Sequence, residues 1–129
     1  MKSFILTIIF ISSLYGYELN WLHDYDAAIS QAKKEHKDIY VFVGADECRF
    51  CDRFKDLTLS KKEVIDRLKK EFILVYLSRD QHKIPKNFAI KGVPRHYFIT
   101  SKGEIIHDDR GSREPAGFYD MLDEVDLKK

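Results

Sequence analysis

The stretch that decides the fold is Ile39-Tyr40-Val41-Phe42-Val43-Gly44, followed shortly by Cys48-Arg49-Phe50-Cys51. Its first five residues form an unbroken run of β-branched and aromatic side chains, which is typical of a strand buried on both faces. Gly44 ends that run, and a helix is expected over residues 48–57. The pattern therefore predicts a buried strand that leads into a helix, with two cysteines in the first helical turn.

The rest of the chain alternates between helical and strand patterns. Asp24 is a candidate N-cap, Ser60 and Glu63 fit a capping box, and Pro85 and Pro115 each suit a first helical turn. In chain order we expect helix 24–36, strand 39–43, helix 48–57, helix 60–68, strand 72–77, short helix 85–90, strand 96–100, strand 104–107 and helix 115–125.

This order of elements predicts an α/β fold. Strands separated by helices favour parallel pairing, whereas the short turn at residues 101–103 makes the last two strands an antiparallel hairpin. The expected architecture is a three-layer sandwich, in which a mixed central sheet is flanked by helices.

Length and composition limit the class of protein. The chain has 129 residues, of which 44% are hydrophobic and 33% charged, as suits a single folded domain. Its formal charge of +1 gives no basic footprint for nucleic acid, so we expect no nucleic-acid partner. Two cysteines are too few for a disulfide-stapled scaffold, so their placement becomes the main question.

The N-terminus has the pattern of a secretory signal peptide. Lys2 supplies a positive charge, residues 4–11 are almost entirely apolar, and Gly16 offers a small residue for cleavage. A membrane span needs about 20 apolar residues, so the stretch is too short to cross and stay. We therefore expect residues 1–16 to be removed, residues 17–129 to form the domain, and the destination to be the periplasm.

The cysteines stand where the predicted strand gives way to the predicted helix. Unpaired N–H groups and the macrodipole at a helix N-terminus favour an anion, so the pKa of a thiol there is lowered. Cys48 is therefore the candidate nucleophile. Cys51, one turn further on and more shielded, can attack a mixed disulfide formed on Cys48 and release the product.

A zinc half-site and an inert structural pair are the alternatives. A zinc site needs four ligands, commonly a second Cys pair or two closely spaced histidines. The five histidines show no such spacing: they are His23, His36, His82, His96 and His107. We interpret His96 and His107 as surface residues of strands, and no metal site is predicted.

A second signal is Gly92-Val93-Pro94, directly before the predicted strand 96–100. Combined with the strand that ends in Cys-x-x-Cys, it makes the chain resemble the thioredoxin-fold superfamily over about residues 20–127. Within it the chain is similar to small exported thiol:disulfide interchange proteins. The resemblance implies a cis peptide bond at Val93–Pro94 beside Cys48, and a Val93 backbone that pairs with an extended substrate segment. Arg49 and Phe50 are candidate substrate contacts.

The chain also departs from the family's pattern. Glu47 stands where thioredoxins usually carry Trp, and Phe42 stands where they hold a buried acid. Removal of the Cys51 proton must then use another group or water, and Asp46 and Glu47 are nearby, although solvated surface is the favoured interpretation of both. The lone Trp21 is placed in the first helix, as core packing.

Charges around the first cysteine affect its expected pKa and hence the expected reduction potential. Asp46 and Glu47 oppose ionisation of Cys48, while Arg49 favours it. The predicted result is a moderately lowered thiol pKa, hence a reducing or intermediate potential.

The sequence thus predicts an exported thiol–disulfide oxidoreductase that uses Cys48 and Cys51. No dissociable cofactor is needed, because the cysteine pair itself carries two electrons. The resemblance implies two kinds of partner, cysteine-containing exported client proteins and a membrane-bound electron donor, and we expect a monomer.

Three alternatives remain. The first is an oxidase that introduces disulfides with the same residues. The second is a metal-binding or metallochaperone module that holds a soft ion such as Cu(I) on Cys48 and Cys51. The third is a binding or chaperone domain whose thiols are incidental.

Overall fold

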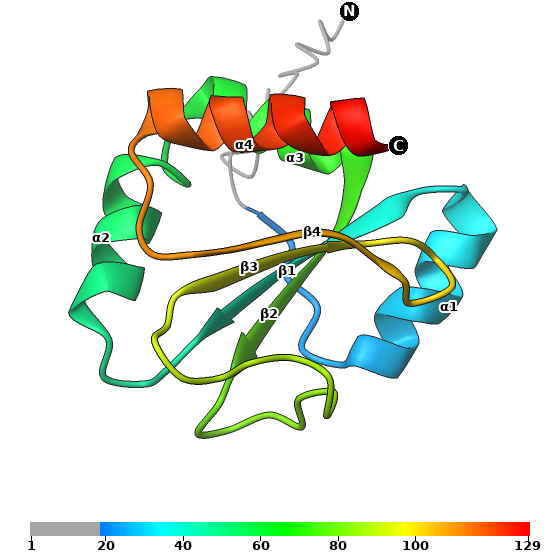
Figure 1. The fold of residues 1–129 in the computed structure, drawn as a ribbon, viewed down its shortest axis with the longest axis horizontal. Coiled ribbons are helices and arrows are strands. Elements are labelled where there is room, and N and C mark those ends of the chain that lie inside the picture. Colours follow the sequence, from blue (N-terminus) through cyan, green and yellow to red (C-terminus); the bar gives the residue numbers. More distant parts are fainter. Residues whose placement is uncertain (1–18) are drawn as a thin grey trace, which may run out of the picture.

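The structure is a computed structural model that describes residues 19–129, so the signal peptide expected over residues 1–16 lies outside the described residues. Its elements, drawn in Figure 1, are α1 (Tyr25–Glu35), β1 (Asp38–Gly44), α2 (Arg49–Leu57), α3 (Lys62–Glu71), β2 (Phe72–Ser78), β3 (Arg95–Ile99), β4 (Ile105–Arg110) and α4 (Pro115–Lys128).

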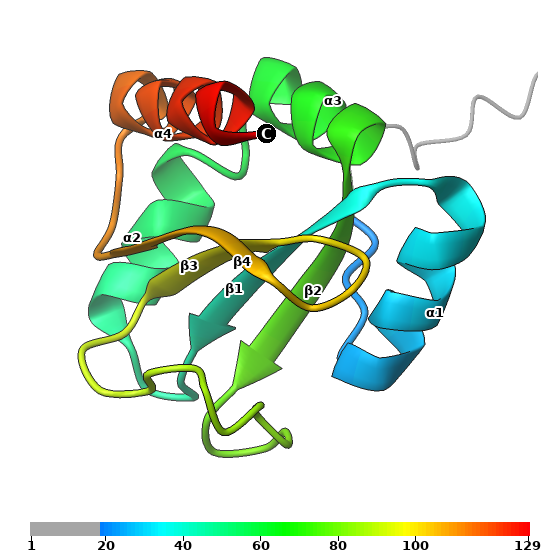
Figure 2. The same cartoon turned by 45° about the vertical axis from the view of Figure 1, so that its right-hand side comes forward.

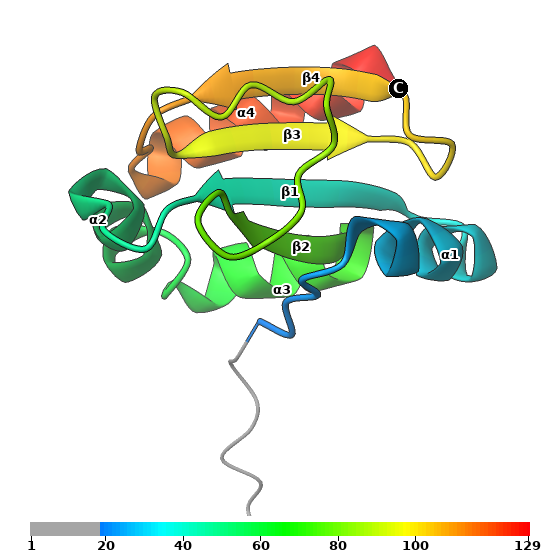
Figure 3. The same cartoon turned by 90° about the horizontal axis from the view of Figure 1, so that it is seen from below.

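The sheet is mixed, as predicted. Its strand order is β2-β1-β3-β4, with β1 parallel to β2 and antiparallel to β3. β3 and β4 form the expected antiparallel hairpin. Seen from below in Figure 3, β1 and β3 lie between the two outer strands. The strand that precedes the cysteines is therefore central and paired along both edges.

Helices cover both faces of the sheet and complete the predicted three layers. Figures 1 and 2 show α1 on one side, with α3 and α4 on the other. Side chains of β1 alternate between two cores: Tyr40 and Phe42 join the core under α2, α3 and α4, whereas Ile39, Val41 and Val43 face α1. None of the helices formed within residues 19–129 is long and apolar enough to cross a membrane.

Two of the predicted helix starts can be compared with the observed caps. Asp24 caps α1 as predicted, because its carboxylate accepts the Ala27 N–H at 3.0 Å. The capping box at Ser60 is wrong. The Ser60 hydroxyl donates to the Asp56 carbonyl of the preceding helix, and α3 begins after Lys61 without a side-chain cap.

The short helix predicted over residues 85–90 is also wrong. The Ala89 N–H, which a helix would direct to the Pro85 carbonyl, donates instead to the Tyr97 hydroxyl at 2.7 Å. Phe88 stacks on the Tyr97 ring with their centroids 4.1 Å apart. Contacts with β3 thus hold this segment as a loop over the sheet, and this loop leads to Pro94.

Trp21 is not in the first helix, which starts at Tyr25. It lies in the extended segment before α1, where Leu22 pairs with Val75 of β2. Its ring centroid is 6.1 Å from that of Tyr40 and 6.1 Å from that of Phe42. The predicted role in core packing is confirmed, on the face of the sheet that carries α2.

Candidate active site

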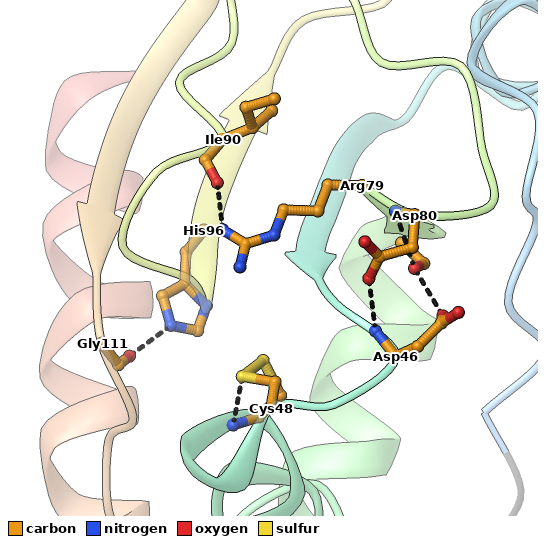
Figure 4. Close-up of a disulfide and its surroundings, with 9 residues drawn as sticks. Asp46, Cys48, Arg79, Asp80, Ile90, His96 and Gly111 are labelled. Carbon is orange, nitrogen blue, oxygen red and sulfur yellow. Dashed lines mark hydrogen bonds between the residues drawn. A yellow bond between two sulfur atoms is a disulfide. The ribbon is translucent and has the colours of Figure 1, made fainter.

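The two cysteines form a disulfide at the start of α2. Their Cα atoms are 5.2 Å apart, and the Cys51 N–H donates to Cys48 Sγ at 3.1 Å, as Figure 4 shows. Cys48 is half-buried, whereas Cys51 is fully buried. A partner can therefore reach the first sulfur while the second stays shielded.

The backbone prepares Cys48 for negative charge. It is the N-cap residue of α2, with extended backbone, so the first turn of N–H groups points toward its side chain. One of these groups, from Cys51, already contacts the sulfur. Such a bond strengthens when the sulfur is a thiolate, since charge-assisted hydrogen bonds are about twice as strong as neutral ones.

Asp46 links the ends of β1 and β2. Its carboxylate accepts hydrogen bonds from the Ser78 hydroxyl at 2.8 Å and the Gln81 amide at 2.6 Å. Its own N–H donates to the Asp80 carboxylate at 2.8 Å (Figure 4). Asp46 and Glu47 are both exposed, as predicted, but Asp46 is engaged in these bonds and fixes the loop that leads to Cys48.

The Val93–Pro94 peptide bond is cis, and Pro94 is buried. The Pro94 carbonyl accepts the Gly111 N–H at 2.8 Å, so the segment after β4 fixes this loop. Gly92, just before it, has a φ of 70°, a conformation that side chains disfavour.

A hollow of about 470 Å³ lies beside the cysteines. It brings the residue between the cysteines, Phe50, together with Val93 of the cis-proline loop. Phe50 is 54% exposed, and the Arg49 guanidinium lies 5.5 Å from its ring centroid. The hollow is lined by Phe50, Arg53, Gly92, Val93, Arg110, Gly111, Ser112 and Glu114.

His96 is a fully buried residue, so its interpretation as a surface histidine is wrong. Its Nε2–H donates to the Gly111 carbonyl at 2.8 Å, and its Nδ1 accepts from the Tyr40 hydroxyl at 2.6 Å. Burial lowers the pKa of His96 to about 4, so the ring is neutral at physiological pH. His107, by contrast, is half-buried on β4, with Lys128 Nζ 2.7 Å from its Nδ1.

Tyr76 is a residue of the site that sequence reasoning missed. It is the one incompletely buried residue of β2, and it pairs in register with Phe42. Lys55 of α2 places its ammonium 4.6 Å from the centroid of the Tyr76 ring. The sequence contained a signal for Tyr76, because one polar ring interrupts an otherwise apolar strand. It did not contain the strand register that places Tyr76 near Cys51.

The structure brings the predicted site residues into two groups. Cys48 and Cys51 are bonded, while Phe50 and Val93 share the hollow. Within residues 19–129 there is no cluster of three or more His, Cys, Asp or Glu side chains arranged to hold a metal ion.

Comparison with known proteins agrees with the fold described above. A family model described as a thioredoxin-like domain matches residues 25–126. The anterior gradient protein 2 homolog of Homo sapiens is 29% identical over 125 residues, which cover 89% of this chain and 69% of that protein. The chain spans 50% to 69% of the length of the curated relatives it matches, so it corresponds to a part of each.

Solved structures share the fold. A thioredoxin from Thermus thermophilus superposes with a TM-score of 0.72 at 24% identity, covering 85% of this chain and 88% of that one. The C-terminal domain of DsbD from Neisseria meningitidis, in its oxidised form, has a TM-score of 0.65 at 21% identity and covers 81% of this chain and 97% of that one. Because the family model extends from the start of α1 into α4, the chain belongs to the thioredoxin-like domain family.

Proposed function

We propose that the protein is a thiol–disulfide oxidoreductase that reduces or exchanges disulfides of exported client proteins. One observation carries the proposal: a half-buried Cys48 at the N-terminus of α2 is bonded to a fully buried Cys51. This arrangement separates an attacking sulfur from a resolving sulfur, which the two-step exchange of disulfides requires.

The reaction begins from the dithiol form. The Cys48 thiolate attacks one sulfur of a client disulfide, so a mixed disulfide forms and the other client sulfur leaves as a thiolate. Cys51 then loses its proton to water and attacks Cys48 Sγ, which releases the second client thiolate. Two electrons pass from the protein to the client, each released thiolate takes up a proton according to its pKa, and the Cys48–Cys51 disulfide remains.

The client is proposed to lie across the hollow. The Val93 backbone beside the cis-proline pairs with an extended client segment, while Phe50 supplies an apolar contact and Arg49 a charge at the rim. In support, Phe50 and Val93 line the same hollow, and Arg49 lies against the Phe50 ring.

The cellular setting is part of the proposal. With the leader removed, the protein acts in the periplasm as a monomer, and a membrane-bound dithiol donor returns the disulfide to the reduced state. No dissociable cofactor enters this cycle.

The equilibrium reduction potential tests the proposal. The protein is titrated with glutathione or dithiothreitol, alkylated, and the two forms are counted by mass. A reductase should give roughly −270 to −220 mV, whereas a value near −120 mV would reassign the protein as an oxidase.

A paired variant completes the test. Cys51→Ser should accumulate the mixed disulfide with a model client, and Cys48→Ser should form none. Failure of the native protein to form the Cys48–Cys51 disulfide would overturn both redox assignments.

A further inference from the structure

The hollow beside the cysteines is lined by more positive than negative charge. Arg53 and Arg110 contribute two cations and Glu114 one anion. Across the described residues, no carboxylate comes within ion-pair distance of the Arg110 guanidinium, which lies over Gly92. The Arg53–Glu114 pair is long, at 3.8 Å, and both side chains are mostly exposed, so it is weak.

On the opposite side of the cysteines, the charge is mostly negative. Asp46, Glu47 and Asp80 surround a smaller hollow there, with Arg79 as its cation. Positive charge at the larger hollow is extended by Arg49, which lies against Phe50. This polarity stands out because the whole chain carries a formal charge of only +1.

We propose that the larger hollow selects client segments that carry Asp or Glu beside the disulfide-bonded cysteine, together with an apolar residue that contacts Phe50 and Val93. The selection rests on the proposed function and adds a substrate class to it. Arg110 is its main determinant, because its guanidinium is free to pair with a client carboxylate. Arg53 adds to the selection by exchanging Glu114 for the client.

Reduction of model peptides tests this selection. One cysteine peptide, linked by a disulfide to a chromogenic thiol, is made with Glu-Glu, Gln-Gln or Lys-Lys flanks. The reduced protein should react with the Glu peptide about three- to tenfold faster than with the Gln peptide at low salt, and slowest with the Lys peptide. Added salt at 0.5 M should remove most of the difference.

Matched variants identify the cause. Arg110→Gln should remove most of the preference, so that its rates with the Glu and Gln peptides become similar. Lys33→Gln, which removes one exposed charge from α1, should leave the preference intact. Equal rates with all three peptides would overturn the selection while the proposed function stands. No reaction of the reduced protein with any peptide, or no reduction of its Cys48–Cys51 disulfide by dithiothreitol, would overturn the proposed function itself.

A separate observation concerns Cys51 and Tyr76. A methyl group on Gly44 would lie 3.0 Å from the Tyr76 hydroxyl oxygen and 3.4 Å from Cys51 Sγ. The missing side chain of Gly44 thus lets the phenol and the resolving sulfur approach the same point. No hydrogen-bond partner of the Tyr76 hydroxyl is found among residues 19–129.

The surroundings keep this phenol protonated. Burial raises the pKa of Tyr76, and the carboxylates of Asp46, Asp52 and Asp80 raise it further, while Lys55 lies over the ring. A protonated phenol can donate a hydrogen bond but cannot act as a base near neutral pH. Phe42, paired beside it, offers no acid for the task.

We infer that, once the Cys48–Cys51 disulfide is reduced, the Tyr76 hydroxyl donates a hydrogen bond to the Cys51 thiolate, a bond that the disulfide form lacks. This bond favours the step in which Cys51 attacks Cys48 Sγ. The Cys51 proton leaves to water, and the phenol keeps its own. Tyr76 is in this sense a positioning residue of the proposed reaction.

The pH profile of the resolving step separates this role from a structural one. In Tyr76→Phe, which keeps the ring contacts, decay of a preformed mixed disulfide should slow about tenfold at pH 7, and its profile should move up by about one pH unit. Tyr119→Phe on α4 serves as the control and should change neither. A Tyr76→Phe profile that coincides with the native one would overturn the inference.

Discussion

His96 shows how a single side chain can join three elements. It lies on β3, donates to Gly111 after β4, and accepts from Tyr40 of β1. Its ring also stacks on Phe42, at an interplanar angle of 10°. The histidine therefore completes a polar contact inside an aromatic core, and it does so only in the neutral form.

Acid should destabilise the protein through His96. Its pKa of about 4 when folded lies below the ordinary 6.5, so between these values the unfolded chain binds the extra proton and stability rises with pH. The free energy of unfolding should fall by about 2–3 kcal/mol from pH 7 to pH 4.5 on account of this group. Urea titration of the native protein and of His96→Gln measures the difference.

Two variants separate the contribution of His96 from that of other titrating groups. His96→Gln should be less stable at pH 7 but should lose less stability on acidification than the native protein. His36→Asn, at the exposed left-handed end of α1, retains His96 and should keep the native pH dependence. Parallel pH curves for the native protein and His96→Gln would contradict the assignment.

Gly44 should tolerate no side chain without displacement of Tyr76. An added methyl group meets both the Tyr76 ring edge and its hydroxyl at 3.0 Å. Gly44→Ala should therefore cost about 1–2 kcal/mol, measured as the free energy of unfolding. Gly117→Ala on α4, where the nearest neighbouring atom is 3.5 Å away, should instead stabilise by up to about 1 kcal/mol. Equal stability of Gly44→Ala and the native protein would show that the ring yields freely.

Residue-level prediction succeeded where chemistry was local. The cysteine pair was found because its spacing and its place after a strand are properties of adjacent residues. The burial of His96 and the position of Tyr76 depend instead on which residues lie opposite each other in the sheet. That register is fixed by both cores together, and no short stretch of sequence contains it.

At the scale of elements, α2 is held against the sheet by one aromatic side chain. Phe54 is fully buried, and its ring centroid is 5.4 Å from Phe42, 4.9 Å from His96 and 5.2 Å from Phe118. The helix that carries both cysteines is thus fixed one turn after Cys51.

Phe54→Ala should cost about 3–5 kcal/mol, because it removes a large core side chain and leaves a cavity. Chemical denaturation measures the loss, and Leu57→Ala, at a 42% exposed position of the same helix, should cost less than about 1 kcal/mol. Similar losses for the two variants would mean that α2 is not anchored through Phe54.

Long periodic elements followed from sequence more reliably than the short helix at residues 85–90 and the helix cap at Ser60 did. The helices and strands with clear periodicity all formed, since burial of one face rewards the pattern throughout its length. The helix predicted over residues 85–90 does not form, because the Ala89 N–H that it would need donates to the Tyr97 hydroxyl of β3 instead. The capping box predicted at Ser60 does not form, because its hydroxyl donates to a carbonyl of α2 instead of capping α3.

For the whole molecule, the mixed sheet and the three layers were predictable as a class, whereas the strand order was not. A strand that is apolar on both faces, together with helices between the parallel strands, favours a layered α/β arrangement. The hollow and its charge could not be predicted, because its lining comes from α2, the loop before β3 and the segment after β4.

The proposed export predicts a defined mature chain. When the full sequence is expressed in a bacterial host, the periplasmic fraction should contain a protein that begins at Tyr17, by intact mass. A Gly16→Leu variant should be processed slowly, because cleavage sites require small residues. Recovery of the uncleaved chain in the cytoplasmic fraction would contradict the expected leader.

The extended segment before α1 has a consequence for the exposed border of the sheet. Leu22 donates its N–H to the Leu74 carbonyl, and its carbonyl accepts from Tyr76, so this segment covers part of the outer side of β2. A bare strand border recruits other chains and promotes aggregation. On the opposite border, β4 already carries His107, Asp108, Asp109 and Arg110, which discourage such recruitment. A truncation that removes Leu19–His23 would thus expose the outer edge of β2 and promote self-association there. A fusion tag placed before Leu19 would leave this edge covered.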